Sequence, residues 1–361
     1  MNEDFQARAE IKRNEYLLET EELFVANKDR WLADFAVHFQ DICNQIQKSQ
    51  ADSVLSAISY LEYTMLYTNF LNRRYIADIF VYGDKSYLDR DQRFIGSYDI
   101  SFLFVFFDQL WDALITLRRR YPGLVPAPEI TAFMMETLPD FYSYLANIAR
   151  LAIGEYLDKS PFAKIAKNEE FMINVGDYMA KTEPVYCAKK TKNADELAVW
   201  FSEQLADKYI FGDYSGLDFS EKSFVYTDFR YSRFQDSKLN KANLEGSALI
   251  GANFRNALME ECRLDNCSIN EADFSHASLK NASFKNAWAK VGLMDEKKWR
   301  FVGFLPVIFR NADLTGADFS GANLKGADFS GARLTDANFS GAITDEAVFT
   351  GCLDWKGSCA R

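Results

Sequence analysis

The feature that most constrains this chain is a five-residue repeat in its C-terminal half. Between residues 311 and 342 the sequence reads NADLTGADFSGANLKGADFSGARLTDANFSGA, with Leu or Phe at every fifth position through residue 339 and Ala two residues before each. An α-helix repeats every 3.6 residues and a strand every two, so neither accounts for this period. The period therefore predicts an architecture in which each short unit packs on its neighbours.

The same register extends over residues 219–349 in a less regular form. Of the 27 positions spaced five apart, thirteen are Phe and eight are Leu, although Phe makes up only 31 of the 361 residues. The residue two places earlier is small from Thr227 to Ala287 and again from Ala312 to Cys352. Because the two signals coincide, we expect one large and one small side chain of each unit to point inward.

Units such as Ala242-Asn243-Leu244 and Ala317-Asp318-Phe319 resemble the pentapeptide-repeat family. The resemblance covers residues 211–352 and implies a right-handed quadrilateral β-helix with four pentapeptides, or twenty residues, in each coil. One stacked column is then expected to contain Phe234, Phe254, Phe274, Met294, Leu314 and Leu334, and the opposite one Phe224, Leu244, Leu264, Phe284, Phe304 and Leu324. The Asp or Asn before each large residue is expected to hydrogen-bond the turn backbone rather than to act as a general acid.

Residues 289–308 (AKVGLMDEKKWRFVGFLPVI) interrupt the pattern. Their number equals one coil, so the sequence leaves open a deviant coil or an extruded loop. In one interpretation, the aromatic residues of this segment pack against the solenoid or against a helical domain expected in residues 1–192. The other is a partner-binding loop, because loops on rigid scaffolds often carry recognition, as loops do in the topoisomerase-binding relatives. The candidate partner-binding residues are Lys297, Lys298, Trp299, Arg300, Phe301, Phe304 and Leu305.

The first half of the chain lacks this repeat and is predicted to be an all-α domain over residues 1–192. Apolar residues at helical spacing predict long helices before residue 82 and further helices near 101–120, 127–158 and 161–179, with residues 181–192 as a loop. Pro139 predicts a break or a new start. A capping helix is expected at 193–210, followed by the solenoid at 211–352 and a tail at 353–361. The predicted fold is therefore an α+β multidomain chain.

No motif of a known catalytic, cofactor-binding or metal-binding site occurs, so no residue is assigned to these roles. We expect His38 to be a packing or surface residue of a helix rather than a base, and His276 to be a solvated residue at an outward position of the repeat. Cys262 and Cys267 occupy small inward positions and are expected in the core rather than on a metal. Two basic clusters stand out, Arg73-Arg74 and Arg118-Arg119-Arg120. Positive charge at the C-terminal end of a helix is favourable to the helix dipole, which accounts for the second cluster. The alternative is that this cluster contacts a phosphate or an acidic partner.

The charge balance argues against a nucleic-acid-binding surface. The chain carries 41 basic and 52 acidic residues, for a net charge of −11. The first residues form no apolar leader, and the run from Ile100 to Leu117 is interrupted by Asp108 and Asp112. Six scattered cysteines suit a reducing compartment. These features predict a cytoplasmic protein without a membrane partner.

The leading functional hypothesis is a non-enzymatic scaffold that binds an unknown protein partner. An alternative is a DNA mimic that binds a type II topoisomerase such as gyrase. Residues 212–352 carry a net charge of only −3, whereas DNA has about one negative charge per 1.7 Å, so the magnitude argues against mimicry. A third hypothesis places an enzymatic site in the helical domain. A homodimer, formed end to end or through that domain, is also left open.

Overall fold

The computed structural model describes residues 2–83, 92–156, 161–178, 182–188, 209–289 and 305–354. The chain divides into two compact units, Met1–Lys190 and Thr191–Arg361. The predicted capping helix lies outside the described residues, apart from the last residues of its range. Among the helices of the described ranges, none combines the length and apolarity needed to cross a bilayer.

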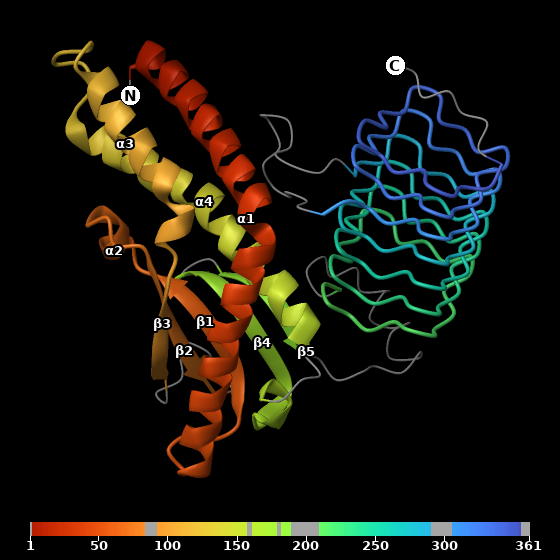
Figure 1. Ribbon diagram of the computed structural model, residues 1–361, viewed down its shortest axis with the longest axis horizontal. Helices are drawn as coiled ribbons and strands as arrows, with labels where there is room; N and C mark the ends of the chain where they lie inside the picture. The colour runs from red at the N-terminus through yellow and green to blue at the C-terminus, as the bar shows by residue number, and fades with distance from the viewer. Residues whose placement is uncertain are drawn as a thin grey trace. The chain divides into compact units, whose positions relative to one another are not determined.

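The first unit contains a five-stranded sheet as well as helices (Figure 1), so the prediction of an all-α domain is wrong. The strands are β1 Ile58–Met65, β2 Ile76–Tyr82, β3 Arg93–Asp99, β4 Lys167–Asp177 and β5 Thr182–Ala188. Their order in the sheet is β3-β2-β1-β4-β5. Strands β1 and β4 are parallel, and the other neighbouring pairs are antiparallel.

The helical interpretation failed because strands buried on both faces do not alternate between apolar and polar residues. In β1, Ile58, Leu61 and Met65 follow the i, i+3, i+7 spacing of a helix by coincidence, and seven of its eight residues are buried. Strand β4 likewise occupies most of the helix predicted at 161–179, and β5 lies within the loop predicted at 181–192. Pro184 fits β5 because this strand forms an edge of the sheet.

The main helices are α1 Glu3–Ala51, α3 Val105–Arg118 and α4 Ala127–Tyr156, with a short α2 at Tyr67–Leu71. The side chain of Asn2 caps α1 by accepting a hydrogen bond from the Phe5 backbone N–H at 3.2 Å. Helix α4 includes Pro139 in its interior, so the predicted break does not occur. Helix α1 contacts α3, α4 and β3, and Figure 1 shows it passing beside both the helices and the sheet.

Aromatic side chains join these layers. The ring of Phe35 on α1 lies 5.4 Å from that of Tyr63 on β1 and 5.4 Å from that of Tyr98 on β3. Towards the other helices, the ring of Phe24 lies 5.3 Å from that of Tyr144 on α4. The high aromatic content of this half of the chain therefore serves its interior.

The second unit is a stack of coils held by parallel β-bridges. Four bridging positions occur in each coil, and the bridged residues are twenty apart, as in Asp213↔Arg233, Asp218↔Lys238, Ser223↔Asn243 and Asp228↔Ala248. Each of these bridges begins a ladder, so four ladders run along the stack of coils. The large and small residues of the repeat fill the interior, where Leu244, Phe254 and Ala257 are fully buried. This interior confirms the inward positions expected from the repeat.

The ladders continue across the interruption with a changed spacing. Asp273 pairs with Ile308, Ser278 with Asp313, Ser283 with Asp318 and Trp288 with Asn323, which places each pair 35 residues apart instead of twenty. Fifteen residues, 290–304, are therefore not needed for any coil, and the deviant-coil interpretation is wrong. Fifteen is a multiple of five, so the five-residue pattern continues in register after the interruption. Because fifteen is not a multiple of twenty, each later unit lies on a different ladder from the one that uninterrupted twenty-residue coils would give it.

The predicted columns must be corrected accordingly after Phe274 and Phe284. The ring of Phe274 stacks on Phe309 at 5.1 Å, in the place predicted for Met294. The ring of Phe284 stacks on Phe319 at 4.8 Å, in the place predicted for Phe304. The first column therefore contains Phe234, Phe254, Phe274, Phe309, Phe329 and Phe349.

Candidate functional site

The outer surface of the coils is the candidate functional site of the second unit. The Asp or Asn before each large residue accepts a hydrogen bond from the backbone N–H two residues later, as from Ser220 to Asp218 at 3.0 Å and from Ser320 to Asp318 at 2.9 Å. This bond confirms the role predicted for these residues. Their side chains fix the turns, and the rows of carboxylates are structural.

The turns also dictate which residues occupy the second position after the large residue. The φ angle at this position is positive throughout residues 211–286 and 311–351. Gly adopts this left-handed conformation at little cost, and Asn tolerates it better than other residues do. The regular stretch accordingly has Gly at 316, 321, 326, 331, 341 and 351.

Three aromatic residues occupy this position near the start of the solenoid. The exposed fraction of Tyr226 is 79%. A Cβ atom on Gly246 would lie 2.4 Å from the Tyr226 ring, and one on Gly251 would lie 2.4 Å from the Tyr231 ring, so each ring covers the glycine of the next coil. Phe211 stacks on Tyr231 at 5.1 Å. These three residues were not predicted from the sequence, although bulky side chains at a position that favours glycine were the available signal.

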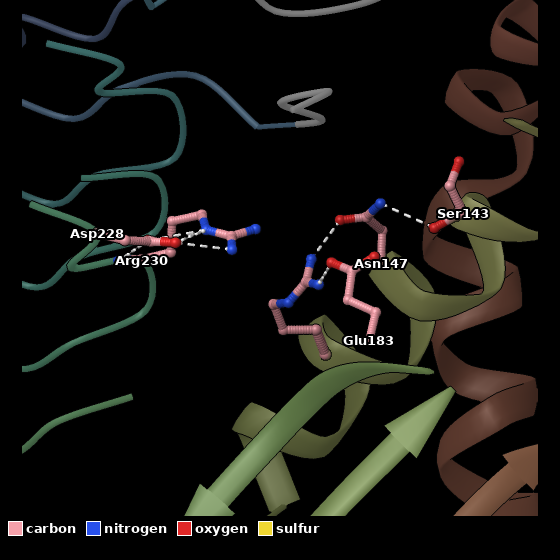
Figure 2. A network of polar contacts seen from close by, with 6 residues as sticks. Ser143, Asn147, Glu183, Asp228 and Arg230 are labelled. Atoms are coloured by element: carbon pink, nitrogen blue, oxygen red, sulfur yellow. Dashed lines mark hydrogen bonds and ion pairs between the residues drawn. The ribbon is translucent and has the colours of Figure 1, made fainter. Parts of the chain in front are cut away.

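Ion pairs between coils neutralise many of the surface charges. The Arg233 guanidinium lies 2.7 Å from the Asp213 carboxylate, and the Arg263 guanidinium lies 2.8 Å from that of Glu245. Further pairs are Lys238–Asp218, Lys280–Glu260, Lys285–Asp318, Arg310–Asp328 and Lys325–Glu346. Within one coil, Arg230 binds Asp228 at 2.8 Å (Figure 2). The outer surface thus carries charges of both signs, and many of its carboxylates are paired with Lys or Arg.

Hydrogen bonds also stabilise the ionised form of the turn carboxylates. The backbone N–H of Ser220 lowers the pKa of Asp218, and Lys238 contributes a smaller attraction. Burial raises the pKa of Asp328, but hydrogen bonds from Ser330 and Arg310 outweigh it and leave this pKa below its usual range. These carboxylates are therefore held charged, which does not suit a general acid at neutral pH.

The candidate partner-binding residues can be placed only at one end. Lys297, Lys298, Trp299, Arg300, Phe301 and Phe304 lie outside the described residues. Leu305 is partly buried, and its backbone N–H donates a hydrogen bond to Glu271 Oε1 at 3.3 Å. The chain thus rejoins the coils beside Glu271.

In the first unit, a buried arginine links α4 to β5. The Arg150 side chain is 8% exposed and lies 2.6 Å from Glu183 Oε1. It also donates to the Asn147 side-chain oxygen at 2.5 Å, while the Asn147 amide donates to the Ser143 carbonyl at 2.9 Å (Figure 2). The ion pair of Arg150 with Glu183 therefore anchors α4 to the edge strand β5.

A buried acid, Asp177, lies at the end of β4. Asp177 is 5% exposed, and the hydroxyls of Tyr67 and Tyr142 donate to its Oδ2 at 3.0 and 3.3 Å. Burial raises the pKa of Asp177, against the two hydrogen bonds. Within the described ranges, no group of three or more His, Cys, Asp or Glu side chains is arranged to hold a metal ion.

The two histidines lie in different environments. The His38 ring stacks on Tyr98 at 4.4 Å, and burial lowers the pKa of His38 to about 4, against a weaker attraction to Asp41. His38 on α1 therefore packs against Tyr98 of β3, which is one of the two roles predicted for it. His276 is exposed at a turn, as predicted.

The predicted basic clusters and core cysteines can also be placed. Arg73 binds the carboxylates of Asp108 and Asp112. The cluster of three arginines lies where α3 ends, and Arg118 Nε donates to the Val125 carbonyl at 2.7 Å, in agreement with a helix-end role. Cys262 and Cys267 are fully buried, as predicted.

Sequence comparison agrees with the ladders in the second unit. The family model "Pentapeptide repeats" matches in eight copies, over residues 227–266, 247–286 and 307–341. The matched segments stop before residues 290–304 and resume after them. The C-terminal half of this chain is a pentapeptide-repeat array. Proteins with this repeat fold as right-handed β-helices. No family model matched the first unit, and no curated protein sequence matched the chain.

Solved structures that resemble the chain are also pentapeptide-repeat proteins. QnrB1, a plasmid-mediated fluoroquinolone resistance protein, is 17% identical over 40% of this chain and 76% of its own, with a TM-score of 0.28. HetL from the cyanobacterium Nostoc sp. strain PCC 7120 is 20% identical over 46% of this chain and 99% of its own, with a TM-score of 0.18. A protein of the Arabidopsis thaliana thylakoid lumen is 30% identical over 31% and 68%, with a TM-score of 0.16.

Proposed function

We propose that this protein is a non-enzymatic interaction scaffold whose pentapeptide-repeat array, a quadrilateral β-helix, supports a recognition segment at residues 290–304. The observation that carries the proposal is the continuity of all four ladders without these fifteen residues. A segment that the coils do not need is free to vary for binding.

The composition of the segment supports a protein partner. Residues 297–304 combine Trp299, Phe301 and Phe304 with Lys297, Lys298 and Arg300. Aromatic residues and arginine dominate the energetics of protein interfaces, because they bury large areas at modest entropic cost. The expected partner therefore presents an apolar pocket with acidic residues around it, in a cytoplasmic setting that suits the free cysteines.

Affinity capture from the native cytoplasm tests this proposal. The bait proteins are the full chain, a variant lacking residues 290–304, and the point variants Trp299→Ala and Tyr226→Ala. We expect a specific partner to be retained by the full chain and by Tyr226→Ala, which removes an exposed aromatic residue elsewhere on the array. The same partner should be lost with the deletion and reduced at least tenfold with Trp299→Ala. Equal recovery by all four baits would contradict the proposal.

A further inference from the structure

Helix α1 carries an exposed apolar row in addition to its buried face. Ile11, Leu18 and Val25 follow one another every seven residues and are 59%, 54% and 63% exposed. Seven residues make about two helical turns, so these side chains lie nearly in line. Isolated exposed apolar residues are common on proteins, whereas these three recur in one heptad register and so form a row along one side of α1.

This row is separate from the face of α1 that forms the core. Leu17 and Phe24 are fully buried, and each lies one residue before a member of the exposed row. One residue turns a helix by about 100°, so the two apolar faces are clearly distinct. The core of the first unit therefore does not account for Ile11, Leu18 and Val25.

An acidic row accompanies the apolar one at a fixed offset. Glu15, Glu22 and Asp29 each follow a member of the apolar row by four residues, and all three are exposed. Residues four apart lie on the same side of a helix. The Glu15 carboxylate has Lys12 at 4.0 Å, whereas Glu22 and Asp29 form no ion pair within the described part of the chain. In heptad terms, the apolar residues occupy one seam position and the acids the flanking position that selects a partner.

We propose that this face of α1 docks a basic amphipathic helix of a partner protein. Its apolar residues would recur every seven positions and cover Ile11, Leu18 and Val25, while flanking Lys or Arg would meet Glu15, Glu22 and Asp29. A second copy of α1 is a poor occupant, because antiparallel pairing would set the acidic row against itself. The site lies on the first unit and goes beyond the function proposed for residues 290–304.

A pair of synthetic peptides tests the proposal with the full-length protein. The basic probe is a helical 21-residue peptide with Leu in heptad spacing and Lys at the flanking positions, and its counterpart has Glu in place of Lys. Binding is measured by fluorescence anisotropy of the labelled peptides. We expect the basic peptide to bind at least tenfold more tightly than the acidic one, with an affinity that falls as salt is raised.

Matched variants locate the binding face. The double variant Leu18→Ser, Val25→Ser and the charge reversal Glu22→Lys should each lower the affinity of the basic peptide at least tenfold. Val37→Ser should not, because Val37 is similarly exposed at 62% but lies about 120° around the helix from Val25. Glu136→Lys, at an exposed acid of α4, controls for the reversal. Circular dichroism confirms that each variant is folded.

Two outcomes would overturn the proposal. The first is equal binding of both peptides, or equal affinity of the double variant and Val37→Ser. The second is sedimentation equilibrium showing a dimer of the wild-type chain that the double variant abolishes, which would assign the face to a second copy. Because the apolar row is tested apart from residues 290–304, its failure would leave the proposed scaffold function unaffected.

Discussion

At the scale of single residues, the turns of the array give its glycines two separate roles. Gly216 and Gly246 have nearly the same φ, +71° and +70°. A Cβ on Gly216 would meet nothing within 4 Å, whereas one on Gly246 would lie 2.4 Å from the Tyr226 ring. Substitutions at Gly216 and Gly246 therefore distinguish the conformational requirement for glycine from the steric requirement for a residue without a Cβ atom.

We expect Gly216→Ala to destabilise the array by about 1–2 kcal/mol, the usual cost of a left-handed conformation. Gly246→Ala should cost on the order of 1 kcal/mol more, because the Tyr226 ring must move away. Chemical unfolding followed by circular dichroism measures the difference. In the background of Tyr226→Ala the two substitutions should become equal. A difference that persists there would show that the ring is not its cause.

His38 makes the stability of the first unit depend on pH. Burial lowers the pKa of His38 from 6.5 to about 4, so the unfolded chain binds a proton more readily than the folded one between these values. The contribution of neutral His38 to stability is therefore complete above about pH 6.5 and lost as the pH falls towards 4. We predict that His38→Phe, which keeps a ring against Tyr98, reduces this loss.

The measurement compares urea midpoints at several pH values from 4 to 7. Subtracting the variant from the wild type removes the effect of the carboxylates common to both chains. The urea midpoint of His38→Phe should rise relative to that of the wild type as the pH falls. His276→Gln, the same test at the exposed turn, provides the control. A constant difference across this range would contradict the assignment.

At the scale of elements, the structure could be predicted from the sequence where the same residue type recurs in the same structural environment, as in the coils of the array. Every coil repeats the same interior, so the large and small positions and the Asp or Asn bonds could be predicted from spacing alone. Strands β1 and β4 could not, because residues such as Leu61 and Glu62 are both buried and the strand shows no alternation. The pairing of β1 with β4 also joins segments about a hundred residues apart, and no local pattern encodes such a contact.

The interruption shows the same limit within the repeat. Its length suggested one coil, because Ala289 stands in place of a large residue and Val307 in place of a small one, so residues 289–308 break the pattern at both ends. The structure keeps Ala289 and Val307 fully buried inside the array. Ala289 and Val307 therefore belong to the coils although they depart from the pattern, and only the ladder spacing reveals that fifteen residues are additional.

We predict that deletion of residues 290–304 leaves the array folded. Joining Ala289 to Leu305 gives Phe309 the place that a twenty-residue coil requires, so the stacking of Phe274 on Phe309 is preserved. The unfolding midpoint should change little, because the closure entropy of a loop depends weakly on its length. Deletion of residues 311–325 provides a control of equal length. It removes the buried Leu314, Phe319 and Leu324 and should lower the midpoint strongly.

At the scale of the whole molecule, the charge of the array favours the scaffold proposal over the DNA mimic. The described part of the array, residues 209–289 and 305–354, contains 18 acidic and 12 basic residues, for a net charge of −6. Its longest ladders have seven rungs, from residues such as Asp213 to Val348, which span about 29 Å at the usual strand spacing. Duplex DNA of that length carries about 17 negative charges. The array therefore supplies about a third of the charge, and ion pairs such as Arg233–Asp213 reduce its effect further.

We accordingly expect the purified protein, at micromolar concentration, neither to inhibit DNA supercoiling by bacterial gyrase nor to protect the enzyme from a quinolone. A short DNA duplex serves as the competitor that shows the assay responds. The triple variant Lys238→Gln, Lys280→Gln, Lys285→Gln makes the surface more negative by three charges and frees acids such as Asp218 and Asp318. If the wild-type chain inhibits gyrase and this variant inhibits it more strongly, mimicry by surface charge is correct and the scaffold proposal fails. Inhibition that is lost when residues 290–304 are deleted would instead identify gyrase as the partner of the recognition segment, because the deletion leaves the coils and their ion pairs in place.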